Sequence, residues 1–279
     1  MNLPESLVAA VRNRQAILFA GAGLSCNLGL PLFDVLTAYL DEQLGLRSSR
    51  DVEYPILAEY YLLQTQASGE RRLFEWMKQT WHPANIDIAA SKAHNYILDL
   101  DFPIIYTTNY DSWLECAFDA RRKPYRKIIA VTDLAETGRH ETEIIKFHGD
   151  FDDPSSIVLT ESSFLRRMAL EHPLDIRLRA DSLAKPILFV GYSISDPNIR
   201  YLLFKLQQLW AQHSEAGRKP NSYVLMVERN ELQERLLLGR GVEPIVAEEG
   251  DASAGLTSFF RDLVAAARTG SSALQLVRS

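Results

Sequence analysis

The sequence predicts an α/β fold with an open, mostly parallel, doubly wound sheet. Short apolar runs of strand length alternate with stretches of helical periodicity along most of the chain. Several of these runs end in a turn of glycine or small polar residues that leads into a helix. With 279 residues, of which 47% are hydrophobic and 24% charged, the chain is long enough and apolar enough to bury a core.

The first unit is predicted to be a helix, a strand, a glycine turn and a second helix. An amphipathic helix is expected over residues 3–14 and a buried strand over residues 15–20. Gly21 and Gly23 break the chain directly after this strand, and helical spacing resumes after Pro31. Nucleotide sites are often built on such a unit.

The middle of the chain predicts a helical insert followed by buried strands. Residues 51–100 are rich in helix formers and in aromatic residues, which we expect to pack in a core rather than to contact a cofactor. Continuous apolar runs then predict parallel strands covered on both faces, at 102–106, 143–147 and 186–190. Helices are expected at 111–120, 161–183 and 198–210.

The last part of the chain continues the alternation of strands and helices. Strands are predicted at 222–227 and 243–247, and helices at 230–238 and 255–267. We therefore expect a single domain over residues 1–270, with the helical insert at about 50–100, and a C-terminal tail over 271–279.

The composition disfavours several classes of protein. A net charge of −6 argues against a chain that binds nucleic acid by neutralising phosphates. No apolar run suits a signal peptide or a membrane-spanning helix, so we expect a cytoplasmic protein without a membrane partner. The two cysteines, Cys26 and Cys116, are too few for a disulfide framework or a four-cysteine zinc site.

Four turns are predicted at the carboxyl ends of strands, where open parallel sheets bind their ligands. The first holds Gly21, Ala22, Gly23 and Ser25, small residues that let backbone N–H groups approach a diphosphate while Ser25 adds a hydroxyl. The alternative is a glycine turn that serves packing alone.

The second turn contains Thr108, Asn109 and Asp111. A residue such as Asp111 after a strand often caps the next helix, and this interpretation competes with a ligand-binding role. The third turn places His148 at the end of a strand, where an imidazole suits general base catalysis at neutral pH. A single histidine is, however, more often structural.

The fourth turn runs from Gly191 through Ser193 to Asp196. It is expected either to contact the adenosine half of a dinucleotide or to cap the helix that begins near Pro197. Both roles are compatible in one turn.

Taken in order, the four turns resemble the motifs of the Sir2 (sirtuin) family. The resemblance lies in Gly-Ala-Gly-Leu-Ser at 21–25 with Gly-Leu-Pro at 29–31, Thr-Thr-Asn-Tyr-Asp at 107–111, His-Gly at 148–149 and Gly-Tyr-Ser at 191–193. Lys-Phe-His-Gly-Asp at 146–150 and Gly-Tyr-Ser-x-x-Asp-Pro-Asn at 191–198 are similar to the prokaryotic SIR2-like branch. This resemblance implies a Rossmann-like fold with a smaller inserted helical module.

The chain also departs from the protein deacylases of that family. Those enzymes carry a zinc ribbon with four cysteines after the His-Gly pair, and this chain has no cysteine there, so we expect no zinc ribbon and no zinc. They also carry Asp-Phe-Arg after Gly-Ile-Pro, where this chain has Leu32-Phe33-Asp34.

The resemblance implies an NAD⁺ glycohydrolase that releases nicotinamide and ADP-ribose, as in many antiphage defence proteins of the prokaryotic branch. The catalytic residues would be Asn109, which orients the nicotinamide ribose or a water, and His148, which takes a proton. Asp111 would shape the nicotinamide pocket. The remaining cofactor-binding residues would be Gly21, Ala22, Gly23, Ser25, Thr108, Gly191, Ser193 and Asp196.

Two other functions stay open at this stage. The chain can be a deacylase or ADP-ribosyltransferase that passes the ribose to another acceptor, or a module that senses NAD⁺ or ADP-ribose without turnover. For a hydrolase we expect gating by a homo-oligomer or by a separate activator subunit. Analogy with the family offers a HerA-like ATPase, an Argonaute-like protein or a nucleotide-processing protein as that subunit.

Overall fold

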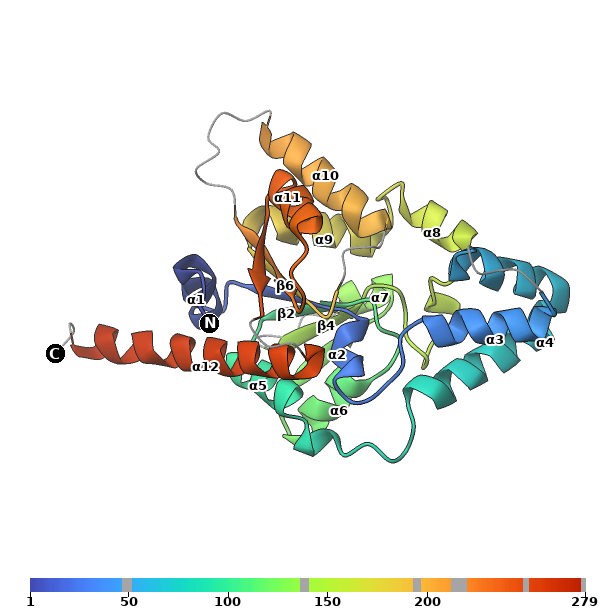
Figure 1. Ribbon diagram of the computed structural model, residues 1–279, viewed down its shortest axis with the longest axis horizontal. Helices are drawn as coiled ribbons and strands as arrows, with labels where there is room; N and C mark the ends of the chain where they lie inside the picture. The colour runs from blue at the N-terminus through green and yellow to red at the C-terminus, as the bar shows by residue number, and fades with distance from the viewer. Residues whose placement is uncertain (47–51, 136–140, 193–196, 212–219, 248–250, 277–279) are drawn as a thin grey trace.

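The computed structural model describes residues 1–46, 52–135, 141–192, 197–211, 220–247 and 251–276. Its centre is a parallel seven-stranded sheet with the order β3-β4-β2-β1-β5-β6-β7 (Figure 1). The strands are β1 Ile17–Ala20, β2 Ile104–Thr107, β3 Tyr125–Ile128, β4 Thr142–Lys146, β5 Ile187–Val190, β6 Ser222–Met226 and β7 Val242–Val246. Each neighbouring pair is parallel, which confirms the predicted fold class.

The strand order reverses direction at β1, in the middle of the sheet. Strands β2 to β4 lie on one side of β1, and β5 to β7 lie on the other. Ala20, the last residue of β1, pairs with Thr107 of β2 and with Val190 of β5, and Thr107 pairs with Lys146 of β4. Four strands therefore end together at the topological switch point, where sheets of this kind bind ligands.

Helices cover both faces of the sheet because consecutive strand residues point to opposite sides. On one face, Leu18 and Ile105 share a buried cluster with side chains of α1 (Glu5–Arg12), α5 (Lys92–Leu100), α6 (Trp113–Ala120) and α12 (Ala252–Leu276). On the other face, Ile17 and Phe19 pack with α9 (Pro173–Ala184), α10 (Pro197–Ala211) and α11 (Glu231–Gly239), and α7 (Val131–Ala135) packs beside them.

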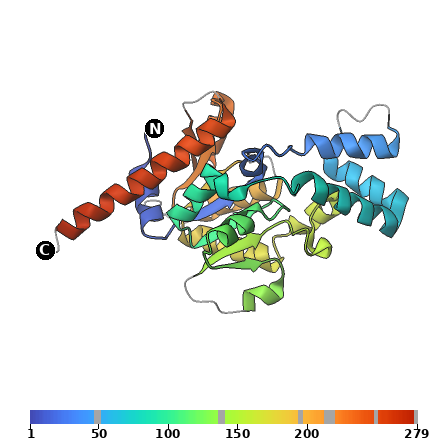
Figure 2. The same ribbon diagram turned by 90° about the horizontal axis from the view of Figure 1, so that it is seen from below.

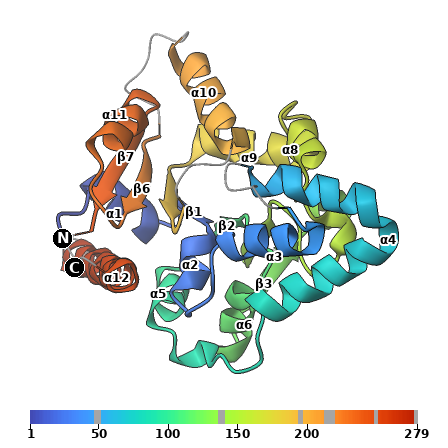
Figure 3. The ribbon, with the colours of Figure 1, turned by 45° about the vertical axis from the view of Figure 1, so that its right-hand side comes forward.

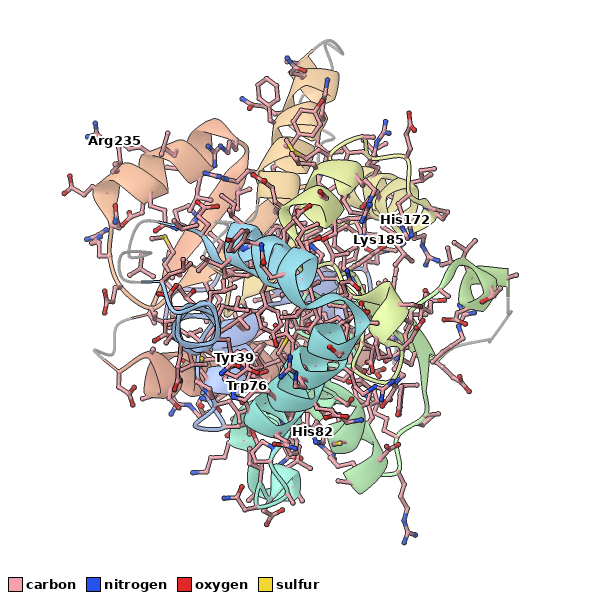
Figure 4. All side chains as sticks on the ribbon, turned by 90° about the vertical axis from the view of Figure 1, so that its right-hand side faces the viewer. Tyr39, Trp76, His82, His172, Lys185 and Arg235 are labelled. Carbon is pink, nitrogen blue, oxygen red and sulfur yellow. The ribbon has the colours of Figure 1, made fainter. Side chains whose placement is uncertain are left out.

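The helical module, formed by α3 (Asp34–Leu44) and α4 (Tyr54–Trp81), projects from one side of the sheet (Figures 2 and 3). Helix α4 turns back on itself at Gln66, whose φ of 51° and ψ of −151° are not helical. Tyr39 of α3 stacks on Trp76 of α4 with 4.0 Å between ring centroids, and the two side chains lie together in Figure 4. The aromatic residues expected to form a core thus hold the two helices together.

The end of α4 contacts the sheet domain at Trp113 of α6. His82, which follows α4 and is labelled in Figure 4, stacks on Trp113 of α6 with 4.2 Å between centroids and 6° between planes. The short η1 helix (Ile88–Ala90) then leads to α5. Helix α8 (Glu161–Arg167) lies beside α4, where the Ser162 N–H donates to Glu59 Oε2 at 2.6 Å.

Several elements differ from the sequence prediction. The helix expected over 161–183 is two helices, because Leu170 adopts a positive φ of 55° and Pro173 starts α9. Strand β3 and helix α7 were not predicted, and α12 runs from Ala252 to Leu276, longer than the expected helix and into the expected tail. Among the described residues, no helix combines the length and apolar character needed to cross a membrane.

Candidate functional site

The turns after β1 and β5 pack directly against each other at the switch point. The Gly23 N–H donates to the Gly191 carbonyl at 2.8 Å, and the Gly21 N–H donates to the Val190 carbonyl at 2.9 Å. A Cβ on Gly23 would lie 2.7 Å from Gly191 Cα, and a Cβ on Gly191 would lie 2.4 Å from the Leu24 nitrogen. Close approach of the two backbones therefore requires these glycines, whatever the turn binds, and their contact with a diphosphate stays a prediction.

A directional chain of hydrogen bonds links three predicted site residues. The Asn109 Nδ2 donates to the Gly21 carbonyl at 3.1 Å and to Ser25 Oγ at 2.9 Å, and Ser25 Oγ donates to Asp111 Oδ2 at 2.7 Å. Because a carbonyl oxygen only accepts, the contact with Gly21 fixes the orientation of the Asn109 amide. The remaining polar atom of the Asn109 side chain is therefore Oδ1, which accepts hydrogen bonds.

Asp111 makes the contact with α6 that a capping role requires, and its role in ligand binding stays a prediction. Its Oδ1 accepts from the Trp113 N–H at 3.3 Å, so it contacts the first turn of α6 while Oδ2 binds Ser25. Burial raises the pKa of Asp111, although the charge of Lys146 and the Ser25 hydrogen bond oppose this shift. Lys146 and Ser25 thus favour the ionised form of this carboxyl group, whereas its burial favours the neutral form.

A small pocket that is partly open to solvent lies over this hydrogen-bond chain. Its polar side is formed by Ser25, Asn109 and Asp111, together with Ala22. Its other walls are apolar and aromatic: Pro31, Phe33, Trp81, Tyr110 and Phe151. Two hydrogen bonds position Trp81. Its indole Nε1 donates to the Pro31 carbonyl at 2.7 Å, and its backbone carbonyl accepts from Trp113 Nε1 at 2.9 Å.

Sequence reasoning missed the aromatic walls of this pocket. Trp81 was assigned to a core, and it does pack in the buried cluster of the helical module while also facing the pocket. Phe33 stood in the motif region of the sequence, two residues after Pro31, and its position was the one available signal. Nothing in the spacing of Trp81 distinguishes it from the other aromatics of α4.

His148 lies at the same edge of the sheet but is not part of the pocket lining. It is 4% exposed, and its ring meets Phe164 of α8 edge to face, with 5.2 Å between centroids. Its backbone carbonyl accepts from the Val158 N–H at 2.8 Å. Gly149, with a φ of +93°, lets residues 156–157 pass close by, because a Cβ there would lie 2.4 Å from the Ser156 carbonyl oxygen.

The other predicted binding residues are placed as follows. Thr108 is half-buried in the turn after β2 and, like Gly21, Gly23 and Gly191, is not among the pocket-lining residues. Ser193 and Asp196 lie outside the described residues. Their assignments stay predictions.

A buried cluster of charges lies beneath the site. Lys146, at the end of β4, has a side chain that is 0% exposed and contacts Glu115 and Asp150. Lys146 and Asp150 belong to the Lys-Phe-His-Gly-Asp motif at 146–150, but neither was assigned a role from the sequence, although a lysine at the end of an otherwise apolar strand was a detectable signal. Among the residues that the structure describes, no group of three or more His, Cys, Asp or Glu side chains is arranged to hold a metal ion.

Known proteins resemble the chain in sequence and in fold. A family model described as a SIR2-like domain matches residues 103–245, slightly more than half of the chain. NAD(+) hydrolase ThsA of Enterococcus faecium is 31% identical over 197 residues, 70% of this chain and 40% of that protein. Defense-associated sirtuin 2 of Bacillus subtilis is 27% identical over 214 residues, 74% of this chain and 20% of that protein.

The chain therefore spans about two fifths of the length of the first relative and one fifth of the second. The crystal structure of a Sir2 homologue in complex with NAD superposes with a TM-score of 0.54, over 96% of this chain and 95% of that chain, at 14% identity. This similarity concerns the fold. On the match of the family model, together with the order of its motifs, the chain belongs to the SIR2-like domain family.

Proposed function

We propose that this chain hydrolyses NAD⁺ at the nicotinamide–ribose bond, producing nicotinamide and ADP-ribose. The observation that carries the proposal is the hydrogen-bonded chain of Asn109, Ser25 and Asp111 along one side of an aromatic pocket. The name of the relative from Enterococcus faecium, an NAD(+) hydrolase, supports the same activity.

The pocket suits the nicotinamide end of the substrate. Phe33, Trp81 and Phe151 offer apolar aromatic surface to a flat cationic ring, and Asp111 adds a carboxyl group beside them. These interactions favour binding of the pyridinium form, and they hold the ring where its bond to the ribose can break.

In the proposed reaction, water attacks C1′ of the nicotinamide ribose as the C1′–N bond breaks. The electron pair of that bond goes to the nicotinamide nitrogen, which becomes neutral, and the ribose passes through an oxocarbenium-like state. Asn109 Oδ1 accepts a hydrogen bond from the water or from a ribose hydroxyl and orients it. His148 takes the proton that the attacking water loses, either directly or through a ribose hydroxyl that gives its proton to His148 and recovers one from the water, so one proton is released for each NAD⁺ cleaved.

We further propose that the activity is gated and serves antiphage defence. Unrestricted hydrolysis of NAD⁺ would poison the cell that makes the enzyme, so it needs a switch. One curated relative is named a defense-associated sirtuin. The gate is either assembly into a homo-oligomer or binding of an activator subunit, for which the candidates are a HerA-like ATPase, an Argonaute-like protein and a nucleotide-processing protein.

The test is to incubate the purified chain with NAD⁺, alone and with the products of neighbouring genes, and to quantify nicotinamide and ADP-ribose by chromatography. Asn109→Ala and His148→Ala are each expected to lower the rate by about 10²-fold or more. Asn95→Ala and His172→Ala serve as matched controls, because these side chains lie on α5 and before α9, away from the pocket. Both controls are expected to keep the wild-type rate.

Each alternative outcome has a defined meaning. Absence of nicotinamide release in every combination would overturn the proposed hydrolysis, and equal rates in all variants would overturn the site assignment. Detection of labelled protein or O-acyl-ADP-ribose instead of free ADP-ribose would identify a transferase or deacylase. Calorimetric binding of ADP-ribose without turnover of NAD⁺ would identify a sensing module.

A further inference from the structure

Lys146 has no role in the proposed reaction, yet it lies among the residues that hold the turns of the site in place. It is the last residue of β4 and precedes His148 by two positions. Its side chain is completely buried, which is rare for a lysine because removing an ammonium group from water is costly.

The ammonium group of Lys146 contacts three different segments. It donates to the backbone carbonyl of Asp111, in the turn after β2. It lies 3.4 Å from Glu115 Oε1, in the first turn of α6, and 3.2 Å from Asp150 Oδ2, in the turn after β4. One side chain therefore joins the turn that carries Asn109 and Asp111 to the turn that carries His148.

The charges around Lys146 favour its cationic form. Burial lowers the pKa of Lys146, but the carboxyl groups of Glu115, Asp150 and Asp111 outweigh burial and raise it above its ordinary value. A second cation, Lys127, lies 3.6 Å from Asp150 and 2.8 Å from Asp152 at the outer side of the cluster. Lys146 thus stays protonated at neutral pH between carboxyl groups that have little access to water.

Stability alone is a weak reason to keep this arrangement. Replacing a buried ion pair by apolar side chains of similar size is often neutral or stabilising, so a buried charge cluster is better explained by what it positions. The contact with the Asp111 carbonyl is informative here, because the same residue binds Ser25 with its carboxyl group and thereby sets the orientation of Asn109.

We infer that Lys146 is the positioning residue of this site. Its ammonium group fixes the Asp111 backbone against the turn after β4, so that the Asn109–Ser25–Asp111 chain and His148 keep a constant relation to each other. Glu115 and Asp150 are the counter-ions that hold the ammonium group in place. This inference deepens the proposed function, and its activity measurements rest on that function.

The inference also predicts an electrostatic effect on Asp111. The titratable groups that face Asp111 are Lys146, Glu115, His82, Cys26 and Cys116. Among the influences on Asp111, the charge of Lys146 is the largest that lowers its pKa. Loss of that charge therefore raises the pKa of Asp111 further, and the acid limb of any pH profile that requires ionised Asp111 moves to higher pH.

The test compares Lys146→Met, which keeps length without charge, with Lys146→Arg, which keeps the charge. Hydrogen–deuterium exchange of the unliganded protein comes first, because it needs neither substrate nor turnover. In Lys146→Met, segments 107–115 and 147–153 are expected to exchange about tenfold faster or more, because the lost charge-assisted hydrogen bond and ion pairs no longer oppose local opening of the two turns. Arg177→Met is the matched control: it removes a cation of α9 that pairs with Asp181 on the same helix and with Glu143 near the start of β4, and it is expected to leave these segments unchanged.

The second readout is the pH dependence of ADP-ribose affinity and of NAD⁺ cleavage. Lys146→Met is expected to move the acid limb upward by about one pH unit or more, while Lys146→Arg leaves it in place even if its rate is lower. The affinity for ADP-ribose is measured separately from cleavage. A wild-type protein that binds ADP-ribose but does not cleave NAD⁺ would overturn the proposed hydrolysis. The inference on Lys146 would then be tested by the affinity for ADP-ribose and by hydrogen exchange alone.

Two outcomes would overturn the inference. Unchanged exchange in both segments means that Lys146 does not fix the two turns. Altered exchange with an unmoved acid limb means that Lys146 braces the fold without acting on the site. If Lys146→Met does not fold, the double variant Lys146→Met/Glu115→Gln takes its place, because it removes one cation and one carboxylate together. Exchange at the wild-type rate in both segments of the double variant would also overturn the inference.

Discussion

Replacing Ser25 by alanine tests the hydrogen-bond chain most directly. The change removes the hydroxyl that donates to Asp111 Oδ2 at 2.7 Å and accepts from Asn109 Nδ2 at 2.9 Å, and all three side chains are at least 93% buried. A bond to an ionised group contributes about 1.5–3 kcal/mol and a neutral bond about 1 kcal/mol. We therefore expect Ser25→Ala to lower the free energy of unfolding by about 3 kcal/mol.

The activity should fall as well, because the side-chain amide of Asn109 loses one of its two hydrogen bonds and keeps the one to the Gly21 carbonyl. If the whole loss appears in the transition state, about 3 kcal/mol corresponds to a decrease of about 10²-fold in kcat/KM. Nicotinamide release gives kcat/KM, and urea denaturation gives the free energy of unfolding. The matched control is Ser6→Ala. It removes the 2.6 Å hydrogen bond between the hydroxyl groups of Ser6 on α1 and Tyr223 on β6, away from the pocket.

Two results would refute this reasoning in different ways. Wild-type stability and wild-type kcat/KM in Ser25→Ala would mean that the hydrogen-bond chain does not form in solution. A destabilised variant that cleaves NAD⁺ at the wild-type rate would remove the orientation of Asn109 from the mechanism.

Two further predictions concern stability. Gly191→Ala should lower the free energy of unfolding by about 2–5 kcal/mol, because Gly191 has a φ of +59° and its added Cβ would lie 2.4 Å from the Leu24 nitrogen. Urea denaturation measures this against Gly45→Ala, where φ is +63° but no atom lies within 4 Å, and an equal loss in both variants would contradict the close packing of the two turns. Burial lowers the pKa of His94 from 6.5 to about 4, so the folded protein loses stability as the pH falls from 6.5 towards 4, by about 3 kcal/mol. In His94→Gln this loss between pH 7 and pH 4 should be smaller by about 2–3 kcal/mol, and an unchanged loss would show that folding does not lower the pKa of His94.

The central strands were predictable because their environment leaves a simple pattern. Every residue of β1, β2 and β5 is buried, so these strands read as continuous apolar runs. Strand β3 lies at the edge of the sheet, and three of its four residues are only half-buried. Two of them make ion pairs, Arg126 with Glu143 and Lys127 with Asp152, which gives β3 the composition of a loop.

The position of the site was predictable for a topological reason, while its contacts were not. Turns that follow parallel strands must meet at one edge, and this brings Ser25, Asn109 and Asp111 together as expected. The sequence does not show which donors are already engaged: the Gly23 N–H binds Gly191, and the Ser25 hydroxyl binds Asp111. It also does not show that Phe33 and Trp81 face one pocket, since their proximity depends on how the helical module packs.

The engaged donors constrain how Asn109 can act in the proposed reaction. Both contacts of its Nδ2 are made within the protein, so the amide meets the substrate through Oδ1 and holds a group that donates, such as water or a ribose hydroxyl. A water that donates one hydrogen to Oδ1 can direct a lone pair at C1′ while its other hydrogen goes to a base. Aspartate at position 109 would offer the same acceptor but would place an oxygen against the Gly21 carbonyl, where the amide donates. The need for an acceptor on one side and a donor on the other explains why an amide, rather than a carboxylate, suits this position.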